Sequence, residues 1–286
     1  MKSLLVIAGL DPSGGAGVVA DVRLAEHQGV RALAVVTALT VQDTSGVRAV
    51  HSLPGELIAD QLSALLSDIE VAAVKIGMLG TEEVARAVAA GLALTAAPVV
   101  WDPVWAPTSD GTTAREDGGS IRLLTGSLAA VAELLARHVT VATPNVPEAA
   151  ALCGFDVRTV ADARRAAGAI ADRMECAVVV KGGHLPPPPA KPGATPAIGG
   201  GDDRAPRPVG SIVDVLCERG ECVEIDAPRV ELVQPVHGTG CAFSTALACE
   251  LAAGRAIEAA VRTAGQVVRA RLSDPARFGR GHPSVM

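Results

Sequence analysis

A short segment near the C-terminal end of the chain combines residue types that suit phosphate chemistry. Residues 237–241 read His-Gly-Thr-Gly-Cys, and an apolar helical pattern follows them directly and ends at Gly254. A glycine-rich turn that leads into a helix presents unpaired N–H groups at the positive end of the helix dipole, so we expect it to bind an anion. Cys241 would lie in the first helical turn, where a thiolate is favoured, and is a candidate base. A glycine turn before a core helix with a buried cysteine explains this segment equally well.

Further polar residues follow short apolar runs that are typical of buried parallel strands. These runs cover residues 3–8, 32–39, 71–76, 98–101, 139–143 and 177–180, and segments with helical spacing lie between them. Ligands of parallel α/β sheets bind beyond the carboxyl ends of the strands, so polar residues there are candidates for a site. The expected fold class is α/β, a doubly wound sheet in one domain that spans residues 1–286.

Four of these polar positions suit metal and phosphate binding. Asp102 follows a strand directly, where a carboxylate can meet Mg²⁺ or a reacting hydroxyl, although aspartate also caps loops there. Asn145 and Glu148 are three residues apart at a helix start, so both could face one ion or phosphate; a capping box has the same spacing. Lys181 ends a strand and is a candidate for neutralising phosphate, because the chain has only four lysines.

Other positions suit recognition of a flat organic ligand. Gln42 stands at a strand end, and its amide can both donate and accept, as the edge of an aminopyrimidine requires; a loop glutamine bonded to backbone is the alternative. The glycine loop at residues 9–17 matches neither a dinucleotide fingerprint nor a P-loop. Asp21 follows that loop and could equally be a solvated helix carboxylate. Lys75 is expected to extend to the surface or to pair with a carboxylate, and Met78 to pack against protein or ligand.

Composition excludes several classes of protein. The chain has 286 residues, 49% of them hydrophobic and only 2% aromatic, so a large core must be built from aliphatic side chains. The net charge of −6 argues against nucleic-acid binding, and we expect neither a membrane span nor a signal peptide. The six cysteines show no CxxC pair. A disulfide framework and a cysteine metal site are therefore not expected, and the interior is expected to be reduced and cytoplasmic.

Two stretches lack a periodic pattern. Residues 104–120 are irregular and could form a lid, and a proline- and glycine-rich stretch at about 185–210 is expected to be a mobile loop rather than a domain. A hairpin is predicted within residues 212–225, a closing helix at 257–272 and a flexible tail at 279–282.

Taken together, the motifs resemble the hydroxymethylpyrimidine/phosphomethylpyrimidine kinases of thiamine biosynthesis, which belong to the ribokinase-like superfamily. The resemblance covers nearly the whole chain, in order, and rests on residues 8–17 with Asp21, 37–39 with Gln42, 75–79, 102–104, 143–149, 181–184 and 237–241. It implies a three-layer sandwich around a mostly parallel sheet. It also implies an enzyme that uses ATP and Mg²⁺ to phosphorylate 4-amino-5-hydroxymethyl-2-methylpyrimidine and then the monophosphate. Such an enzyme would be a cytoplasmic homodimer that binds small molecules and neither nucleic acid nor membrane.

The resemblance also assigns a role to each candidate residue. Gly238, Thr239 and Gly240 would form an anion hole for the transferred phosphoryl group, with Cys241 as the base. Gln42 would recognise the pyrimidine in a pocket lined by Gly9, Ala16, Asp21, Met78 and Val104. Asp102 and Glu148 would organise Mg²⁺, and Asn145, Lys181 and Thr239 would bind the phosphates of ATP. Positioning and charge neutralisation are what phosphoryl transfer requires.

Two places depart from the pattern of that family. After residues 102–104 the family usually continues Ala-Lys-Ser-Gly, whereas residues 105–108 here read Trp-Ala-Pro-Thr. Before the histidine the family usually has Thr-Lys-Asn-Thr, whereas residues 233–236 read Val-Gln-Pro-Val. Each change removes a lysine near the expected phosphates, which puts the second phosphorylation and the affinity for ATP in question.

Two other functions are compatible with the same residues. One is a related vitamin B6 kinase that acts on pyridoxine or pyridoxal. The other is a non-catalytic pyrimidine-binding sensor, which the missing lysines favour and the presence of Cys241, Asp102 and Glu148 disfavours. Consumption of ATP with the pyrimidine alcohol and with pyridoxine would distinguish these functions.

Overall fold

The computed structural model describes residues 1–106, 122–185 and 208–285. Its strands are β1 (Ser3–Leu10), β2 (Arg31–Asp43), β3 (Gly46–Ser52), β4 (Ala73–Ile76), β5 (Gly80–Thr81), β6 (Val99–Trp101), β7 (Leu124–Thr125), β8 (Val141–Ala142), β9 (Ala177–Val180), β10 (Pro208–Glu218) and β11 (Glu221–Val230). Its α-helices are α1 (Gly17–His27), α2 (Gly55–Asp68), α3 (Glu82–Leu92), α4 (Leu128–Leu135), α5 (Val146–Cys153), α6 (Val160–Met174), α7 (Thr239–Ala252) and α8 (Ile257–Leu272). Sequence patterns predicted most of these elements, but not β3, α4 or the two-residue strands β5 and β7.

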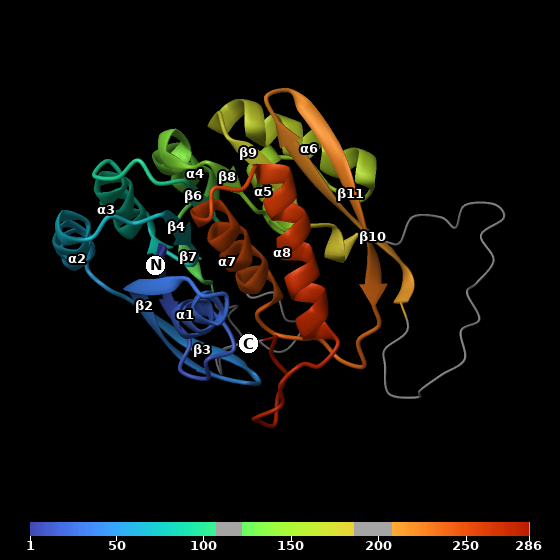
Figure 1. Cartoon of the computed structure of the whole chain (residues 1–286), viewed down its shortest axis with the longest axis horizontal. Helices are drawn as coiled ribbons and strands as arrows, with labels where there is room; N and C mark the ends of the chain where they lie inside the picture. Colours follow the sequence, from blue (N-terminus) through green and yellow to red (C-terminus); the bar gives the residue numbers. More distant parts are fainter. Residues whose placement is uncertain (107–121, 186–207, 286) are drawn as a thin grey trace.

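A nine-stranded sheet of order β11-β10-β9-β8-β6-β4-β1-β2-β3 forms the centre of the described part of the chain. The strands from β9 to β2 are parallel, and antiparallel pairs extend the sheet at both sides, β10 on β9 and β3 on β2. Figure 1 shows helices on both faces of the sheet, with α7 and α8 side by side on one of them. The α/β sandwich with a mostly parallel sheet is therefore confirmed.

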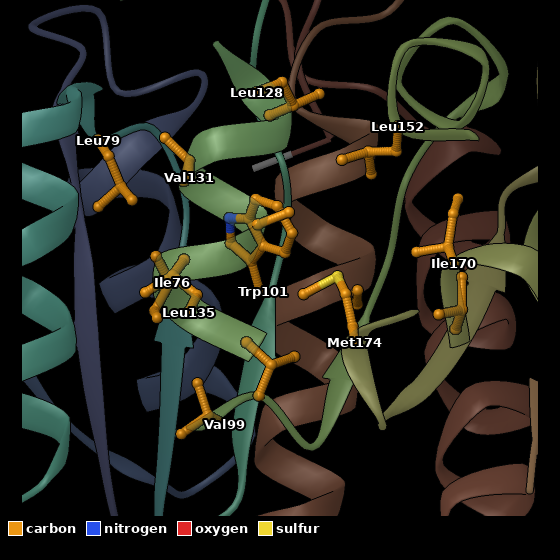
Figure 2. Packing of buried hydrophobic residues seen from close by; sticks show 14 of the residues in the cluster. Ile76, Leu79, Val99, Trp101, Leu128, Val131, Leu135, Leu152, Ile170 and Met174 are labelled. Carbon is orange, nitrogen blue, oxygen red and sulfur yellow. The ribbon is translucent and has the colours of Figure 1, made fainter. Parts of the chain in front are cut away.

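Two apolar cores lie on opposite faces of the sheet, because side chains alternate between the two faces along each strand. On β1, Leu5 faces a core that α2–α6 complete, whereas Leu4 faces a second core completed by α1, α7 and α8. Figure 2 shows Trp101 of β6 in the first core, packed among side chains that include Leu135 of α4 and Met174 of α6. Because strand side chains point alternately to the two faces, each strand contributes to both cores.

The register of the parallel strands aligns their carboxyl ends. Ile76 of β4 is opposite Ile7 of β1 and Trp101 of β6, and Trp101 is in turn opposite Ala142 of β8. The residues that follow these strands therefore leave the sheet at one edge. Of the predicted polar residues of the site, Asp102 and Asn145 belong to these segments.

The C-terminal tail, which was expected to be flexible, is docked instead. The backbone N–H groups of Gly281 and His282 donate to Thr44 Oγ1 and O, at 3.0 and 2.8 Å. Ser284 donates to the carbonyl of Gly15 at 3.1 Å. The tail therefore joins the β2–β3 turn to the glycine loop after β1.

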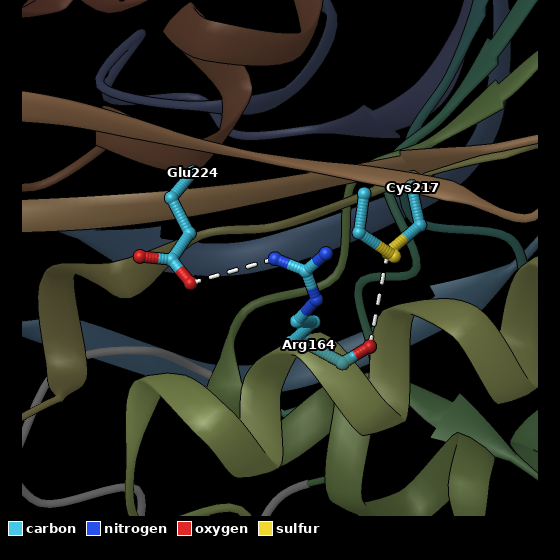
Figure 3. The surroundings of a disulfide bond; sticks show 4 residues. Arg164, Cys217 and Glu224 are labelled. Atoms are coloured by element: carbon cyan, nitrogen blue, oxygen red, sulfur yellow. Dashed lines mark hydrogen bonds and ion pairs between the residues drawn. A yellow bond between two sulfur atoms is a disulfide. The ribbon is translucent and has the colours of Figure 1, made fainter.

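The expectation of a reduced interior is wrong at one pair of cysteines. Cys217 and Cys222 are opposite each other on the β10–β11 hairpin, with Cα atoms 4.1 Å apart, and are disulfide-bonded. The Cys217 sulfur lies 3.7 Å from the carbonyl oxygen of Arg164 on α6, and the Arg164 guanidinium lies 3.7 Å from Glu224. Figure 3 shows both contacts as dashed lines. Cross-strand pairing across a two-residue turn produces this proximity, and a search for CxxC does not detect it.

Two predicted irregular stretches lie largely outside the described residues. Of the predicted lid at 104–120, residues 107–120 are not described, and of the predicted loop at about 185–210, residues 186–207 are not described. Pro208–Gly210 belong to β10 rather than to a loop. In the described ranges, no helix combines the length and apolar character that crossing a membrane requires.

Candidate active site

A cavity of about 430 Å³ opens at the carboxyl ends of the parallel strands. Its walls include the predicted site residues Gly9, Ala16, Gln42, Met78, Asp102, Val104, Asn145, Glu148, Lys181, Gly238, Thr239, Gly240 and Cys241. Asp21 alone of the predicted site residues is not part of this wall. The fold thus gathers the candidates around one space, and their roles toward a ligand stay predictions.

The glycine turn before α7 brings the helix start close to a charged pair. Gly238 is the N-cap with φ 84°, a left-handed conformation that glycine adopts without strain. A Cβ on Gly240 would lie 3.2 Å from Lys181 Nζ and 3.7 Å from Asp102 Oδ2. The predicted turn into a helix is therefore confirmed, and its unpaired N–H groups lie at the cavity wall.

Asp102 and Lys181 form this charged pair, with Lys181 Nζ 2.8 Å from Asp102 Oδ1. The hydroxyl oxygens of Thr143 and Ser244 lie 3.2 Å from Oδ1 and 3.3 Å from Oδ2. Burial raises the pKa of Asp102, but Lys181 and Lys75 outweigh it and hold the pKa below its ordinary value. Asp102 is therefore an ionised carboxylate, and Thr143 and Ser244, which sequence patterns left without a role, help to hold it.

Asn145 and Glu148 do form a capping box at the start of α5. Asn145 Oδ1 accepts from the Glu148 N–H at 2.9 Å, and Glu148 Oε2 accepts from the Asn145 N–H at 2.8 Å. Both residues nevertheless line the cavity. Burial raises the pKa of Glu148 to about 7, opposed by the charge of Lys181 and supported by that of Asp102. The capping alternative is confirmed, and it leaves a role toward an ion open.

The donor set suits a metal ion that arrives together with phosphates. The described residues contain no group of three or more side chains that could hold a metal ion by themselves. Mg²⁺ is usually bound by one or two carboxylates, with water and substrate phosphates completing its shell. Asp102 and Glu148, two carboxyl groups at the same end of the cavity, fit that pattern.

Lys75 reaches the cavity from β4 and is fully buried. Its neighbours Val74 and Ile76 face the core under α2–α6, so alternation directs Lys75 toward α1 and α7. Lys75 Nζ lies 2.5 Å from Asp21 Oδ2, and Thr245 donates to Asp21 Oδ1 at 2.8 Å. The predicted pairing of Lys75 with a carboxylate is confirmed. Asp21 is buried behind the wall rather than solvated, and its carboxylate contacts Lys75, which does line the cavity.

The charge states of this buried pair follow from its contacts. Burial lowers the pKa of Lys75, but the Asp21 carboxylate outweighs burial and holds the pKa above its ordinary value. Burial raises the pKa of Asp21, and Lys75 and Thr245 oppose this. Lys75 is therefore a buried ammonium that faces the cavity end where Asp102 and Cys241 lie.

Cys241 lies in the first turn of α7, as predicted. Burial raises the pKa of its thiol to about 11; Lys75 offsets part of this, and the Asp21 and Asp102 carboxylates add to it. The expectation that the helix start favours a thiolate is therefore wrong here, because loss of water outweighs the helix dipole. Cys241 is a thiol at neutral pH.

The other end of the cavity has smaller and mostly uncharged residues. A Cβ on Gly9 would lie 2.7 Å from Met78 Cε, so the glycine allows β1 to approach this side chain closely. Met78 and Val104 belong to one small apolar cluster. Gln42 is half-buried, and one end of its amide lies 3.2 Å from His237 Nε2. A shallow apolar slot with one amide is suited to a flat heterocycle.

His237, which contacts Gln42, and Asp11, which contacts His237, belong to the sequence motifs but had no predicted role. Asp11 Oδ1 accepts from the N–H and hydroxyl of Ser13, at 2.8 and 2.7 Å, and Oδ2 lies 3.0 Å from Ala16 N and 3.4 Å from His237 Nε2. Burial raises the pKa of Asp11, but the hydrogen bonds from His237 and Ser13 bring it below its ordinary value. The Asp-x-Ser spacing, typical of a side-chain turn, was the available signal.

Comparison with known proteins adds to this geometry. The sequence profile of the phosphomethylpyrimidine kinase family matches residues 11–286. A hydroxymethylpyrimidine/phosphomethylpyrimidine kinase of Haemophilus influenzae is 33% identical over 283 residues, 99% of this chain and 95% of the relative. One of Streptomyces coelicolor is 35% identical over 278 residues, 97% of this chain and 91% of the relative.

Solved structures give the same picture of the fold. An ADP complex of Bacillus subtilis pyridoxal kinase has a TM-score of 0.78 and 28% identity, covering 99% of this chain and 96% of that one. Phosphomethylpyrimidine kinase from Clostridium difficile has a TM-score of 0.69 and 28% identity, covering 94% of this chain and 99% of that one. Structural similarity therefore extends to both vitamin kinases, whereas the sequence profile names one of them.

Proposed function

The chain belongs to the phosphomethylpyrimidine kinase family, and we propose that its cavity binds a pyrimidine alcohol at one end and the phosphates of ATP at the other. It is a phosphotransferase, and its reaction is the ATP-dependent phosphorylation of 4-amino-5-hydroxymethyl-2-methylpyrimidine in thiamine biosynthesis. The alcohol oxygen forms a bond to the terminal phosphorus of ATP, the bond from that phosphorus to ADP breaks, and the alcohol loses its proton.

One observation carries the proposal. The start of α7, the Asp102–Lys181 pair and the Cys241 thiol share one end of a cavity whose other end holds Gln42. Phosphoryl transfer proceeds through a loose transition state, so an enzyme contributes mainly alignment and charge neutralisation. This cavity offers backbone donors, two ammonium groups and a place for a flat ring within one space.

The phosphate end supplies positive charge to a polyanion. Residues Gly238, Thr239 and Gly240 present backbone N–H groups, and Lys181 presents an ammonium beside Gly240. Such donors stabilise charge that develops on the transferred group, because they are already oriented and need not reorganise. Asp102 and Glu148 would hold Mg²⁺, which neutralises phosphate charge when it is bound.

Cys241 is the candidate acceptor of the alcohol proton. Its raised pKa means that only a small fraction is thiolate at neutral pH. A loose transition state tolerates this, because the alcohol becomes strongly acidic only as its bond to phosphorus forms. Lys75 is the cation that favours the thiolate. Asp21 holds Lys75 in place, and Thr245 in turn donates to Asp21.

The proposal is tested by the release of ADP from purified protein supplied with Mg²⁺ and ATP. We expect release with the aminopyrimidine alcohol and much less with pyridoxine, since pyridoxal kinases resemble this chain in structure but the family profile is that of a pyrimidine kinase. Faster turnover of pyridoxine would favour the vitamin B6 kinase. Binding of the pyrimidine without ADP release would favour the sensor.

The second phosphorylation, of the monophosphate, is proposed to be the weaker step. The acceptor then brings about two negative charges toward the phosphates of ATP. One of the two places where the family has a lysine corresponds to Pro107-Thr108, which lie outside the described residues. The other falls at Gln234-Pro235, where the amide oxygen of Gln234 accepts from Arg277 at 2.8 and 3.0 Å.

Initial rates with each acceptor at saturating ATP test this difference. We expect the alcohol to be used faster by about tenfold or more, because like charges repel strongly where water is excluded. Arg277→Gln is expected to widen the gap if this arginine replaces a lysine, whereas exposed Arg173→Gln on α6 is the control. Equal rates with both acceptors would show that the missing lysines do not matter.

The assembly and location of the protein are further parts of the proposal. A homodimer is supported by Leu39 and Val41, which are 44% and 49% exposed on β2, next to the edge strand β3. Sedimentation equilibrium tests it, and a monomer at micromolar concentration would contradict it. A cytoplasmic location is supported by the use of ATP. The net charge of −6 supports the absence of nucleic acid as a partner.

A further inference from the structure

The direction of the Gln42 amide follows from the hydrogen bonds around it. The two ends of an amide are alike in shape and differ only in donating or accepting. One end of this amide lies 3.2 Å from His237 Nε2, and the other lies 3.2 Å from Thr40 Oγ1. Which end is the N–H₂ group therefore depends on whether each neighbour donates or accepts.

The contact with Asp11 requires His237 Nε2 to be a hydrogen-bond donor. The Asp11 carboxylate is 3% exposed, and its hydrogen bonds keep it ionised, so it can only accept. Its Oδ2 lies 3.4 Å from His237 Nε2, a contact that is favourable only when that nitrogen carries a proton. A protonated Nε2 cannot accept a hydrogen bond from Gln42. The end of the amide that faces His237 must therefore be the oxygen.

Thr40 leads to the same orientation from the other side. Its hydroxyl donates to the carbonyl of Leu10 at 2.8 Å, and a hydroxyl has only one proton to donate. Toward Gln42 it can therefore only accept, so the end of the amide that faces Thr40 must be the N–H₂ group. His237 and Thr40, which belong to distant parts of the chain, impose one and the same direction.

We infer that a hydrogen-bond chain from Asp11 through His237 and Gln42 to Thr40 holds the Gln42 amide in one direction, and that His237 is a positioning residue which sets the substrate preference of the site. This inference rests on the proposed pyrimidine substrate for its consequence, but the chain of hydrogen bonds exists without substrate.

His237 is itself held firmly enough to serve this purpose. Its N–H donates to the carbonyl of Pro283 at 2.8 Å, and its carbonyl accepts from Val285 at 3.2 Å. A Cβ on Gly15 would lie 2.9 Å from His237 Cδ2, so the ring packs directly on the glycine loop. The docked tail fixes the backbone of His237, and the glycine loop fixes its ring. The Gln42 amide therefore takes the direction that the His237 ring imposes.

An amide that is held in one direction can bind only one arrangement of hydrogen-bond donor and acceptor on a ligand. With its oxygen bonded to His237 and one N–H bonded to Thr40, Gln42 keeps one lone pair and one N–H for a ligand. A ring nitrogen next to an exocyclic amine offers the complementary pair. A 4-oxo analogue of the same ring has an N–H next to a carbonyl, which is the reverse order, and would meet an amide that cannot turn over.

Substrate discrimination is the first test. The ratio of kcat/KM for the 4-amino alcohol to that for its 4-oxo analogue is expected to be about 100 in the unaltered protein, since a mismatched polar pair reduces binding by roughly 10- to 100-fold. In His237→Leu only Thr40 still directs the amide, so the ratio is expected to fall about tenfold, with the KM for ATP within about twofold of normal.

Two further variants separate positioning from structure. His237→Gln retains an N–H near the place of Nε2 and is expected to restore most of the ratio, while exposed His27→Leu on α1 is the control. Thr40→Val removes the acceptor at the other end of the amide and is expected to lower the ratio as well. If His237→Leu turns over the 4-amino alcohol but keeps the full ratio, the inference is wrong even though the proposed function holds.

The tautomer of His237 is the second test and needs no substrate. Protein with ¹⁵N-labelled histidine is compared with the labelled His237→Leu variant by NMR, so that the missing signals identify His237. We expect the Nε2 of His237 to carry a proton at neutral pH. A neutral ring protonated only at Nδ1 would overturn the inference, whatever the enzyme phosphorylates. A failure of the unaltered protein to use any pyrimidine alcohol would instead overturn the proposed function.

Discussion

The two ends of the cavity hold their polar groups differently. At the phosphate end, charged groups are paired and withdrawn from water: the Lys75 and Asp21 side chains are 0% exposed, and those of Lys181 and Asp102 are 15% and 3% exposed. At the pyrimidine end, the buried carboxylate of Asp11 contacts the His237 imidazole, whose side chain is 26% exposed, and the imidazole contacts the neutral Gln42 amide. Removing one partner at the phosphate end leaves a buried charge without its counter-charge, whereas removing Gln42 at the pyrimidine end removes one recognition contact.

Cys241→Ala is expected to have the largest effect on catalysis. Turnover should fall by about 10²–10⁴-fold, the usual range for loss of a general base, while the KM for the pyrimidine changes little. Steady-state kinetics measure this. Cys249→Ala on the same helix is the control, because Cys249 is buried and does not line the cavity. Near-normal turnover of Cys241→Ala would mean that the thiol only fills space.

Lys75→Met is expected to have the largest effect on stability. It leaves the Asp21 carboxylate buried without its cation, which should reduce the free energy of unfolding by about 3–5 kcal/mol. Urea unfolding measures this change. The double variant Lys75→Met with Asp21→Leu removes both charges and should recover much of the loss. If the double variant is no more stable than Lys75→Met, the pair does not act as a unit.

Glu148→Gln tests how a buried carboxyl responds to pH. The pKa of about 7 in the folded chain lies above the ordinary 4.5, so between these pH values the folded chain holds a proton that the unfolded chain has released. Stability from this group is present at low pH and is lost as the pH rises through 7. Glutamine keeps the capping box and does not titrate.

Unfolding free energies at pH 5 and pH 8 measure that difference. Relative to the unaltered protein, Glu148→Gln should gain roughly 1–3 kcal/mol on going to the higher pH, a range set by the size of the pKa shift. Exposed Glu56→Gln on α2 should show no such gain. Parallel pH dependence of Glu148→Gln and the unaltered protein would contradict the buried, raised pKa.

Gln42→Leu is expected to have the smallest effect, confined to one substrate. The KM for the pyrimidine should rise by an amount that corresponds to roughly 1–3 kcal/mol, with the KM for ATP little changed, because the ring loses its polar partner. Gln61→Leu on α2, far from the cavity wall, is the control. Equal changes in both KM values would contradict the assignment of Gln42 to pyrimidine binding. They would also contradict the proposed difference between the two ends of the cavity.

Much of the fold was predictable because its signals are local. Apolar runs bounded by glycine or by polar residues predicted β1, β4 and β6, and the spacing of Asn145 and Glu148 predicted a helix start. The prediction that polar residues after these strands share one edge required only that the strands be parallel. β3 was missed because its short, mixed sequence is stabilised by pairing with β2 rather than by a pattern of its own.

The sequence by itself determined which residues stand at the strand ends and where helices begin, because periodicity and turn chemistry are properties of neighbouring positions. Tertiary structure alone decided that Asp21 lies behind the wall, that Cys241 remains a thiol and that Cys217 bonds Cys222. It also decided that a docked tail holds His237 beside Gln42. These outcomes depend on water exclusion and on contacts between segments far apart in the sequence, such as Gln42 and His237, which are 195 positions apart.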